Sequence, residues 1–168
     1  MKIEFGCGEN PSKQDFMTCD IRNLPGINYV CNAWDVDKLI EPKEVKFIFS
    51  RHFFEHLTLS QAARTLKAWH EVLDDGGKVE MVVPNMDYHV AQYLLTRLFP
   101  FQFFDSIRKH SEAGFWGWQR ESEIDESWDV HKFGYNFSSL KDLVKSCGYK
   151  NIKKINSRFR HLHIIFEK

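Results

Sequence analysis

The sequence predicts an α/β fold, and three observations support this prediction. Short apolar segments of strand length alternate along the chain with segments of helical periodicity. Two glycines directly follow the first of these strand segments. The 168 residues contain no internal repeat and no low-complexity linker. We therefore expect a single domain that spans residues 1–168.

Four predicted strands precede the first long helix. Each is short and apolar, and each is bounded by Gly, Pro, Asn or charged residues. They cover residues 2–5, 15–19, 28–31 and 45–49. The connection between the first two strands contains Pro11 and is close to the lower length limit for a helical crossover. We therefore expect a loop with at most one helical turn at this place.

The first long helix is predicted at residues 60–73. Ser60 is a suitable N-cap, and Gly76-Gly77 is expected to stop the helix. The stripe expected to face the core consists of Ala63, Leu66, Trp69, His70 and Leu73.

In the second half of the chain, a strand is predicted at residues 78–83 and a helix at residues 86–98. A long irregular segment follows. Ser138 or Ser139 then caps a helix that runs to Cys147 and ends at Gly148. The strands 151–156 and 161–166 complete the chain.

Composition excludes several classes of function. Lys and Arg number 23 and so do Asp and Glu, so there is no net positive charge to drive non-specific binding of nucleic acid. No apolar run approaches the roughly 20 residues of a membrane span, and no targeting segment is visible. The four cysteines form no Cys-x-x-Cys pair. We therefore expect a soluble cytoplasmic protein with reduced, structural cysteines.

The segment Gly6-Cys7-Gly8 follows the first strand, where glycine permits positive φ and close approach of a ligand. This pattern alone is weak, because Pro11 stands near the place of the third glycine of the dinucleotide fingerprint. Asp20 at the end of the second strand strengthens it, since a carboxylate there can accept two hydrogen bonds from a ribose diol. A turn role for Asp20 is the alternative.

These residues belong to a longer pattern that resembles the class I SAM-dependent methyltransferases, in particular a short branch often found in cell-surface polysaccharide gene clusters. The resemblance covers residues 1–85 and resumes at 131–149. Its segments are Lys-Ile-Glu-Phe-Gly-Cys-Gly-Glu-Asn-Pro, Asp20-Ile21, Asn-Ala-Trp-Asp at 32–35, Phe-Ser-Arg-His-Phe-Phe-Glu-His-Leu at 49–57, Leu-Asp-Asp-Gly-Gly-Lys-Val at 73–79, and Val-Pro-Asn at 83–85.

The resemblance implies a Rossmann-like methyltransferase fold with a mostly parallel seven-stranded sheet. The strand order would be 3-2-1-4-5-7-6, the last strand antiparallel, and the N-terminal half would have reduced helices. The implied cofactor is S-adenosyl-L-methionine, with S-adenosyl-L-homocysteine as its product. The implied acceptor is a small molecule or a saccharide, with O-methylation as the expected reaction.

Carried over position by position, the family pattern implies a cofactor site at the ends of the first four strands. Gly6, Cys7 and Gly8 would wrap the methionine end, with Glu4 and Phe5 before them in the strand. Asp20 would hold the ribose, and Ser50 and Arg51 would face the sulfonium together with His52. The adenine would contact Ile21, Ala33, Trp34 and Asp35.

Three histidines are candidates for a base that accepts a proton from an acceptor hydroxyl, because histidine is the side chain that ordinarily titrates near working pH. His52 ranks first for its position after the fourth strand, and His131 ranks second, with a structural role as its alternative. His56 is the third candidate. No metal ligands are assigned.

Two other functions compete with methyl transfer. The chain begins at Met1 without the N-terminal helix that covers the site in many relatives, which favours a catalytically silent, methyltransferase-like binding module. The residues His52-Phe53-Phe54-Glu55-His56 also match His-x-x-Glu-His, a zinc signature of peptidases. The space before the helix start at Ser60 is small for the long helix of such a site.

Aromatic residues are concentrated after the predicted strand 78–83. We interpret residues 86–130 as an acceptor-binding insertion, because function in this class of fold lies on loops above a rigid sheet. Ordinary core or a homodimer face is the alternative. The acidic stretch 121–129 is expected to be a solvated loop.

Overall fold

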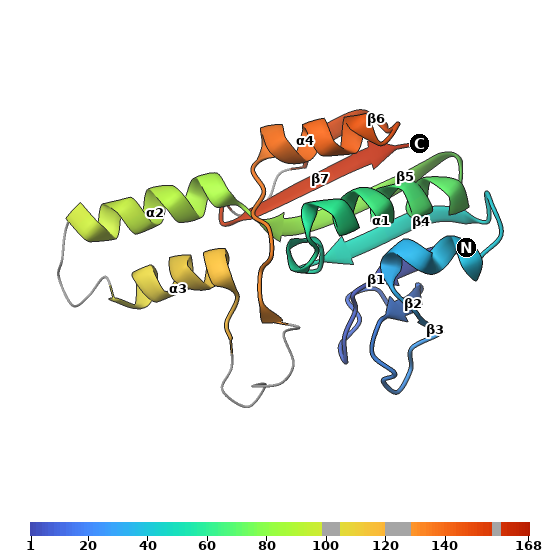
Figure 1. Ribbon diagram of the computed structural model, residues 1–168, viewed down its shortest axis with the longest axis horizontal. Helices are drawn as coiled ribbons and strands as arrows, with labels where there is room; N and C mark the ends of the chain where they lie inside the picture. The colour runs from blue at the N-terminus through green and yellow to red at the C-terminus, as the bar shows by residue number, and fades with distance from the viewer. Residues whose placement is uncertain (99–104, 120–128, 156–158) are drawn as a thin grey trace.

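The computed structural model describes residues 1–98, 105–119, 129–155 and 159–168, which form a seven-stranded sheet with helices on it (Figure 1). The strands are β1 (Lys2–Phe5), β2 (Met17–Asp20), β3 (Tyr29–Val30), β4 (Val45–Arg51), β5 (Leu73–Pro84), β6 (Lys150–Lys154) and β7 (His161–Glu167). The α-helices are α1 (Leu59–Val72), α2 (Met86–Leu98), α3 (Asp105–Trp116) and α4 (Phe137–Ser146). Two 3₁₀ turns are η1 (Ala33–Lys38) and η2 (Phe54–His56).

The sheet has the order β3-β2-β1-β4-β5-β7-β6, so the predicted strand order is confirmed. Strands β1 to β5 pair in parallel, whereas β7 is antiparallel to both β5 and β6. The carboxyl ends of β1, β2 and β4 consequently lie at one edge of the sheet. Ligands of open α/β sheets bind at such an edge.

The connection from β1 to β2 contains no helix, as predicted. The Glu4 carboxylate accepts hydrogen bonds from the backbone N–H of Ser12, at 2.9 Å to each oxygen, and of Lys13, at 2.9 Å. One side chain of β1 therefore satisfies the backbone donors with which the chain turns back toward β2. A crossover helix is not needed to position the loop.

Both predicted helix caps were two to three residues away from the observed ones. Helix α1 is capped by Thr58 rather than Ser60, because the Thr58 hydroxyl accepts from Gln61 N–H while the Gln61 side chain accepts from Thr58 N–H. Asn136, rather than Ser138 or Ser139, caps α4 through the same reciprocal arrangement with Ser139.

The glycine pair after α1 was also misassigned. The helix ends at Val72 and β5 begins at Leu73, so Gly76 and Gly77 lie inside the segment of β5 rather than ending the helix. The buried face of α1 is shifted accordingly. It comprises Ala62, Thr65, Leu66, Ala68, Trp69 and Val72.

Helix α3 lies in the segment predicted to be irregular, and that prediction was wrong. It pairs with α2, and the two helices extend beyond the end of the sheet (Figure 1). The buried residues of this α2–α3 hairpin are His89, Thr96, Ser111 and Gly114. Because the residues at the contact between α2 and α3 are polar or small, the sequence of α3 has no apolar stripe from which the helix could be predicted. Residues 99–104 and 120–128, which include most of the predicted acidic loop, lie outside the described residues.

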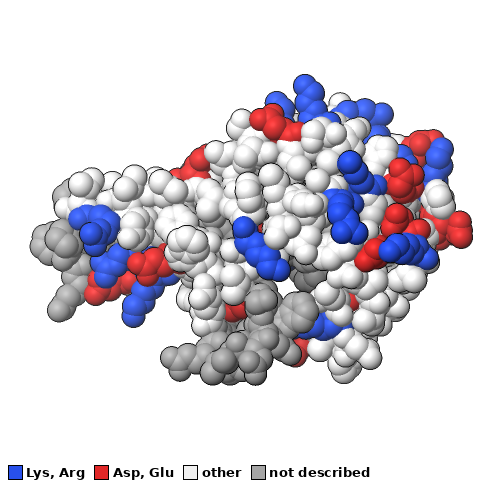
Figure 2. Space-filling model, viewed as in Figure 1, with Lys and Arg blue, Asp and Glu red and all other residues white. Residues whose placement is uncertain are grey.

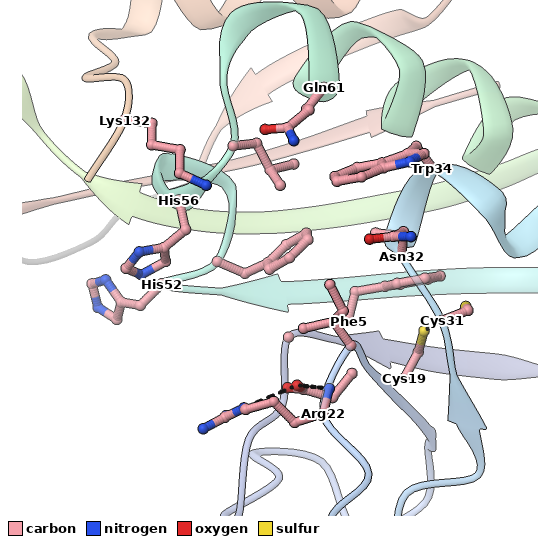
Figure 3. Close-up of a pocket in the computed structure, with 16 residues that line it drawn as sticks. Phe5, Cys19, Arg22, Cys31, Asn32, Trp34, His52, His56, Gln61 and Lys132 are labelled. Atoms are coloured by element: carbon pink, nitrogen blue, oxygen red, sulfur yellow. Dashed lines mark hydrogen bonds and ion pairs between the residues drawn. The ribbon is translucent and has the colours of Figure 1, made fainter. Parts of the chain in front are cut away.

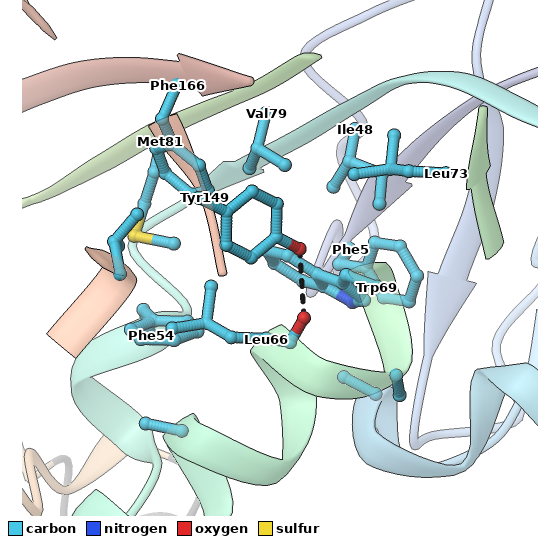
Figure 4. Close-up of a cluster of buried hydrophobic side chains, with 14 of the residues drawn as sticks. Phe5, Ile48, Phe54, Leu66, Trp69, Leu73, Val79, Met81, Tyr149 and Phe166 are labelled. Carbon is cyan, nitrogen blue, oxygen red and sulfur yellow. Dashed lines mark hydrogen bonds between the residues drawn. The ribbon is translucent and has the colours of Figure 1, made fainter. Parts of the chain in front are cut away.

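The hydrophobic core lies between the sheet and the helices α1 and α4 (Figure 4). Trp69 of α1 packs on Phe5 of β1 with ring centroids 4.7 Å apart, and on Phe54 at 6.0 Å. The buried Tyr149 hydroxyl donates to the Leu66 carbonyl at 2.9 Å. The end of β1 and the turn η2 are thereby fixed against α1.

Charged residues of both signs lie among one another on the face shown in Figure 2, most clearly at the right of the view, near the end of α1 and the beginnings of β4 and β5. Across the described residues, no helix combines the length and apolar character that a membrane crossing requires.

Candidate functional site

A cavity of about 410 Å³ opens at the carboxyl ends of β1, β2 and β4, below the start of α1 (Figure 3). We call one end the thiol end, which is lined by Cys19, Asp20, Cys31, Ala33 and Trp34. The opposite end, the histidine end, is lined by His52, His56 and Lys132. Gly6 and Phe53 lie between the two. The volume is within the range of small-molecule sites.

The glycine at position 6 is required by its neighbours. Gly6 has φ +65°, and a Cβ at this position would lie 2.4 Å from the ring of Phe53. Its N–H donates to the Cys19 carbonyl at 2.8 Å, which ties the turn to β2. A side chain would displace the aromatic wall of the cavity, so only glycine fits.

Asp20 holds the turn from the other side. Its Oδ2 accepts from Gly8 N–H at 2.9 Å, and its Oδ1 accepts from the backbone N–H and the Nε of Arg22 at 3.0 and 3.2 Å (Figure 3). The carboxylate is 6% exposed and lines the cavity. Because an ionised carboxylate has about four acceptor sites, Asp20 retains capacity for a ligand hydroxyl.

The thiol end combines apolar and thiol side chains with the polar groups of Asp20, Arg22 and Asn32. The sulfur atoms of Cys19 and Cys31 lie 3.6 Å apart, and all four cysteines of the chain are free. The hydrogen bond with Cys31, together with burial, raises the pKa of the Cys19 thiol well above its usual range, so this thiol is neutral. Trp34 and Ala33, both on η1, complete a flat wall.

The histidine end begins where β4 ends. His52 has φ +50°, an uncommon conformation for a residue other than glycine, and its N–H donates to Val82 of β5 at 2.9 Å. Backbone strain of this kind occurs where the surrounding structure holds a functional side chain in place. The His52 Nδ1 lies 3.2 Å from Oε1 of Glu55, and both His52 and His56 line the cavity.

Glu55 is buried behind these imidazoles and is 1% exposed. Burial by itself raises the pKa of this carboxyl, but the hydrogen bond from His52 and the charge of His56 outweigh it and hold the pKa below its usual value. His131 Nε2 lies 4.0 Å from Glu55 Oε1, and burial lowers the pKa of His131. The carboxylate is therefore ionised and surrounded by imidazoles.

The segment that carries His131 is attached to η2 through the backbone. The Glu55 carbonyl accepts hydrogen bonds from the N–H groups of Lys132, at 2.8 Å, and Phe133, at 3.2 Å. His131 Nδ1 lies 3.0 Å from the Gly114 carbonyl of α3. Segments far apart in sequence thus meet at the histidine end.

The structure brings together about half of the residues that the sequence suggested for the site. Those that line the cavity are Phe5, Gly6, Asp20, Ile21, Ala33, Trp34, His52 and His56. Those outside its lining are Glu4, Cys7, Gly8, Asp35, Ser50, Arg51 and His131. Asp35, for example, pairs with Lys38 at 2.6 Å, and Glu4 binds the loop after β1.

Sequence reasoning assigned no role to six further lining residues: Arg22, Asn32, Phe53, Leu57, Gln61 and Lys132. Lys132 directly follows His131 in the sequence that resumes the family resemblance, and Phe53 directly follows His52. Their position next to a candidate residue in the sequence was therefore the signal that could have identified these two residues. The peptidase alternative is not supported by local structure, because residues 52–56 span a strand end and the short 3₁₀ turn η2 rather than a long helix.

No protein-family model matches the chain, and no curated protein matches its sequence. Solved structures do match. A SAM-dependent methyltransferase from Archaeoglobus fulgidus has a TM-score of 0.63 at 16% identity, over 99% of this chain and 85% of that chain. One from Methanosarcina mazei has a TM-score of 0.58 at 14% identity, over 99% and 91%.

Human N-acetylserotonin methyltransferase, solved in complex with SAM, has a TM-score of 0.58 at 10% identity, over 99% of this chain and 47% of that chain. These likenesses show that the chain has the fold of the SAM-dependent methyltransferases. The Rossmann-like fold that the sequence resemblance implied, with its mostly parallel seven-stranded sheet, is thus confirmed.

Proposed function

We propose that the chain binds S-adenosyl-L-methionine in the cavity and transfers its methyl group to a small-molecule acceptor. The observation that carries this proposal is the position of Asp20. It is a buried carboxylate at the carboxyl end of β2, joined to the glycine turn after β1, and it faces a cavity of suitable volume in a fold shared with SAM-dependent methyltransferases.

The residues present fit this cofactor. Gly6 leaves backbone rather than side chain at the floor of the cavity, and Asp20 retains acceptor capacity for a ribose hydroxyl. The flat apolar wall of Ala33 and Trp34 suits an adenine ring. The methionine end would then point toward Phe53 and His52.

Bound cofactor supplies a methyl group on a sulfonium, so that a nucleophile forms a new bond to the methyl carbon as the sulfur–carbon bond breaks. The chain's own task is mainly alignment, which can contribute roughly 7–11 kcal/mol. His52 and His56 line the cavity at the end where an acceptor would enter, and either imidazole can take the proton that a hydroxyl loses. We retain His52 as the first candidate.

A hydroxyl of a saccharide is our first candidate acceptor, and O-methylation the expected reaction. The α2–α3 hairpin is the candidate acceptor-binding region, because α2 exposes Val90, Leu94 and Leu95 and the end of α3 exposes Trp116. A homodimer through the same face, and a cytoplasmic location, stay predictions.

Titration calorimetry with S-adenosylhomocysteine tests cofactor binding. Asp20→Ala should weaken the affinity by about 1–3 kcal/mol, or roughly 5- to 150-fold, because a buried diol loses its partner. Asp75→Ala is the matched control, since this exposed carboxylate pairs with Lys43 outside the cavity and should leave the affinity unchanged.

No binding by the wild-type chain at tens of micromolar would refute the proposal. Binding without transfer, measured with labelled cofactor and a panel of hydroxyl, amine and carboxylate acceptors, would instead indicate the catalytically silent module.

A further inference from the structure

We propose that Glu55, His56 and His131 bind one divalent transition-metal ion at the histidine end of the cavity. A carboxylate oxygen of Glu55 and one ring nitrogen of each histidine all lie within 4.8 Å of one another. Two ligands of an ion held at about 2.1 Å are about 3–4 Å apart, so side-chain shifts of about 1 Å complete the site. The sequence by itself assigned no metal.

The hydrogen bonds of both imidazoles fit metal binding. His56 Nδ1 lies 3.1 Å from the Val130 carbonyl, and His131 Nδ1 lies 3.0 Å from the Gly114 carbonyl. Because a carbonyl only accepts, each Nδ1 carries a proton, and Nε2 is the ring nitrogen available to an ion. A metal-binding histidine usually donates the N–H of its other ring nitrogen to a carbonyl or carboxylate, as both rings do here.

The third ligand has a free oxygen. Glu55 is 1% exposed, its Oε1 is the atom near His52 and His131, and its Oε2 has no hydrogen-bond partner among the residues that the structure describes. A buried charged oxygen without a partner is costly. An ion bound between Glu55 and the two imidazoles would supply a partner for Oε2. Hydrogen bonding of the imidazoles to Oε1 alone would leave Oε2 without one.

The ligand set selects the kind of ion. Two imidazoles and one carboxylate suit Zn²⁺, Co²⁺ or Mn²⁺, whereas Mg²⁺ and Ca²⁺ prefer sites made of oxygen atoms. Three protein ligands leave a coordination position open, and His56 lines the cavity, so that position faces the ligand space. The catalytic role rests on the proposed function: an ion there would lower the pKa of an acceptor hydroxyl.

The test uses the full chain after treatment with a chelator. Co²⁺ is titrated while its visible absorption is followed, and Zn²⁺ is titrated by calorimetry. We expect one ion per chain and no competition by Mg²⁺. Glu55→Gln and His131→Ala should lower the ion affinity by at least about 100-fold, because loss of a hydrogen-bond partner of a metal ligand already lowers affinity by up to about 100-fold. His163→Ala is the matched control, because His163 lies 2.9 Å from the Glu80 carboxylate outside this cluster.

Failure to bind Co²⁺ or Zn²⁺, or affinities that both substitutions leave unchanged, would overturn the proposal. If circular dichroism shows that Glu55→Gln does not fold, the ion affinities of His56→Ala and His131→Ala test the proposal instead. Parallel titration with S-adenosylhomocysteine separates the two proposals. Asp20→Ala should lose cofactor affinity and keep the ion, whereas Glu55→Gln and His131→Ala, which change residues outside the cavity lining, should keep cofactor affinity and lose the ion. Ion binding without cofactor binding would leave this site standing and refute the proposed function.

Discussion

The two ends of the cavity differ in how much of the chain builds them. At the thiol end, the hydrogen bond between Gly8 and Asp20 joins residues 12 positions apart. At the histidine end, the contact between His56 and the Val130 carbonyl joins residues 74 positions apart. The thiol end is therefore assembled by consecutive strands, whereas the histidine end forms only once the whole domain has folded.

This difference suggests how the two ends depend on the rest of the molecule. The thiol end rests on the rigid sheet and on η1. The histidine end rests on η2, and on α3 through the Gly114 carbonyl. Changes in the α2–α3 hairpin should therefore affect the histidine end alone, whereas changes at the glycine turn should affect both.

The largest effect is expected for Gly6→Ala, which acts between the two ends. Positive φ costs about 1–2 kcal/mol and the clash with Phe53 about 1–3 kcal/mol more, so the free energy of unfolding should fall by about 2–5 kcal/mol. Urea unfolding measures this, and calorimetry should show weaker binding of both S-adenosylhomocysteine and Zn²⁺.

Gly26→Ala is the control for this change. Gly26 has φ +84°, and a Cβ there would meet nothing within 4 Å, so only the backbone cost of about 1–2 kcal/mol remains. Equal losses in the two variants would show that the Phe53 ring does not constrain position 6.

A smaller effect, confined to one end, is expected for Gly114→Ala. The new Cβ would lie 2.4 Å from the His89 ring and force α2 and α3 apart. Overpacking costs about 1–3 kcal/mol, from which about 1 kcal/mol of helix propensity is recovered. Zn²⁺ affinity should fall, because the displaced Gly114 carbonyl no longer positions the His131 ring. S-adenosylhomocysteine affinity should stay at the wild-type value.

Glu112→Ala, on the same helix, is the control for Gly114→Ala. Equal loss of both ligands in Gly114→Ala would contradict the independence of the two ends.

The smallest effect concerns pH. Burial, with a contribution from His110, lowers the pKa of His89 from 6.5 to about 4. The unfolded chain therefore binds more protons than the folded chain between these values, and the free energy of unfolding falls as pH falls through this window. From pH 7 to 5.5 the loss due to His89 is about 1 kcal/mol.

Urea unfolding at both pH values measures this loss, with His89→Leu as the comparison. His161 has a shift of the same sign, so the readout is the difference between wild type and variant. Identical pH dependence in the two proteins would show that His89 does not stay neutral in the hairpin.

The same distinction between local and distant contacts explains what the sequence could predict. The glycine turn and Asp20 follow from short-range patterns and the strand order from the family resemblance, and the structure contains all three. Helix α3 has a contact face of Ser111 and Gly114, which carries no hydrophobic signal. The caps Thr58 and Asn136 were missed because nearby serines offered equally good local chemistry, and packing decided between them.

At the site, the sequence identified candidates but not their grouping. Glu55 and His56 were recognised as parts of a helical zinc signature with His52, whereas the structure groups them with His131. Only the folded chain brings His131 beside them, through the hydrogen bonds of Lys132 and Phe133 with the Glu55 carbonyl. No spacing rule connects residues that meet in this way.

The loop after β1 has a consequence for engineering. Gly8 is anchored on Asp20 and Ser12 on Glu4, so residues 9–11 bridge two carboxylates over a fixed span. Insertions there would pull one anchor away and distort the floor of the cavity. Labels are better placed at Asp75, whose exposed side chain pairs with Lys43 away from the cavity.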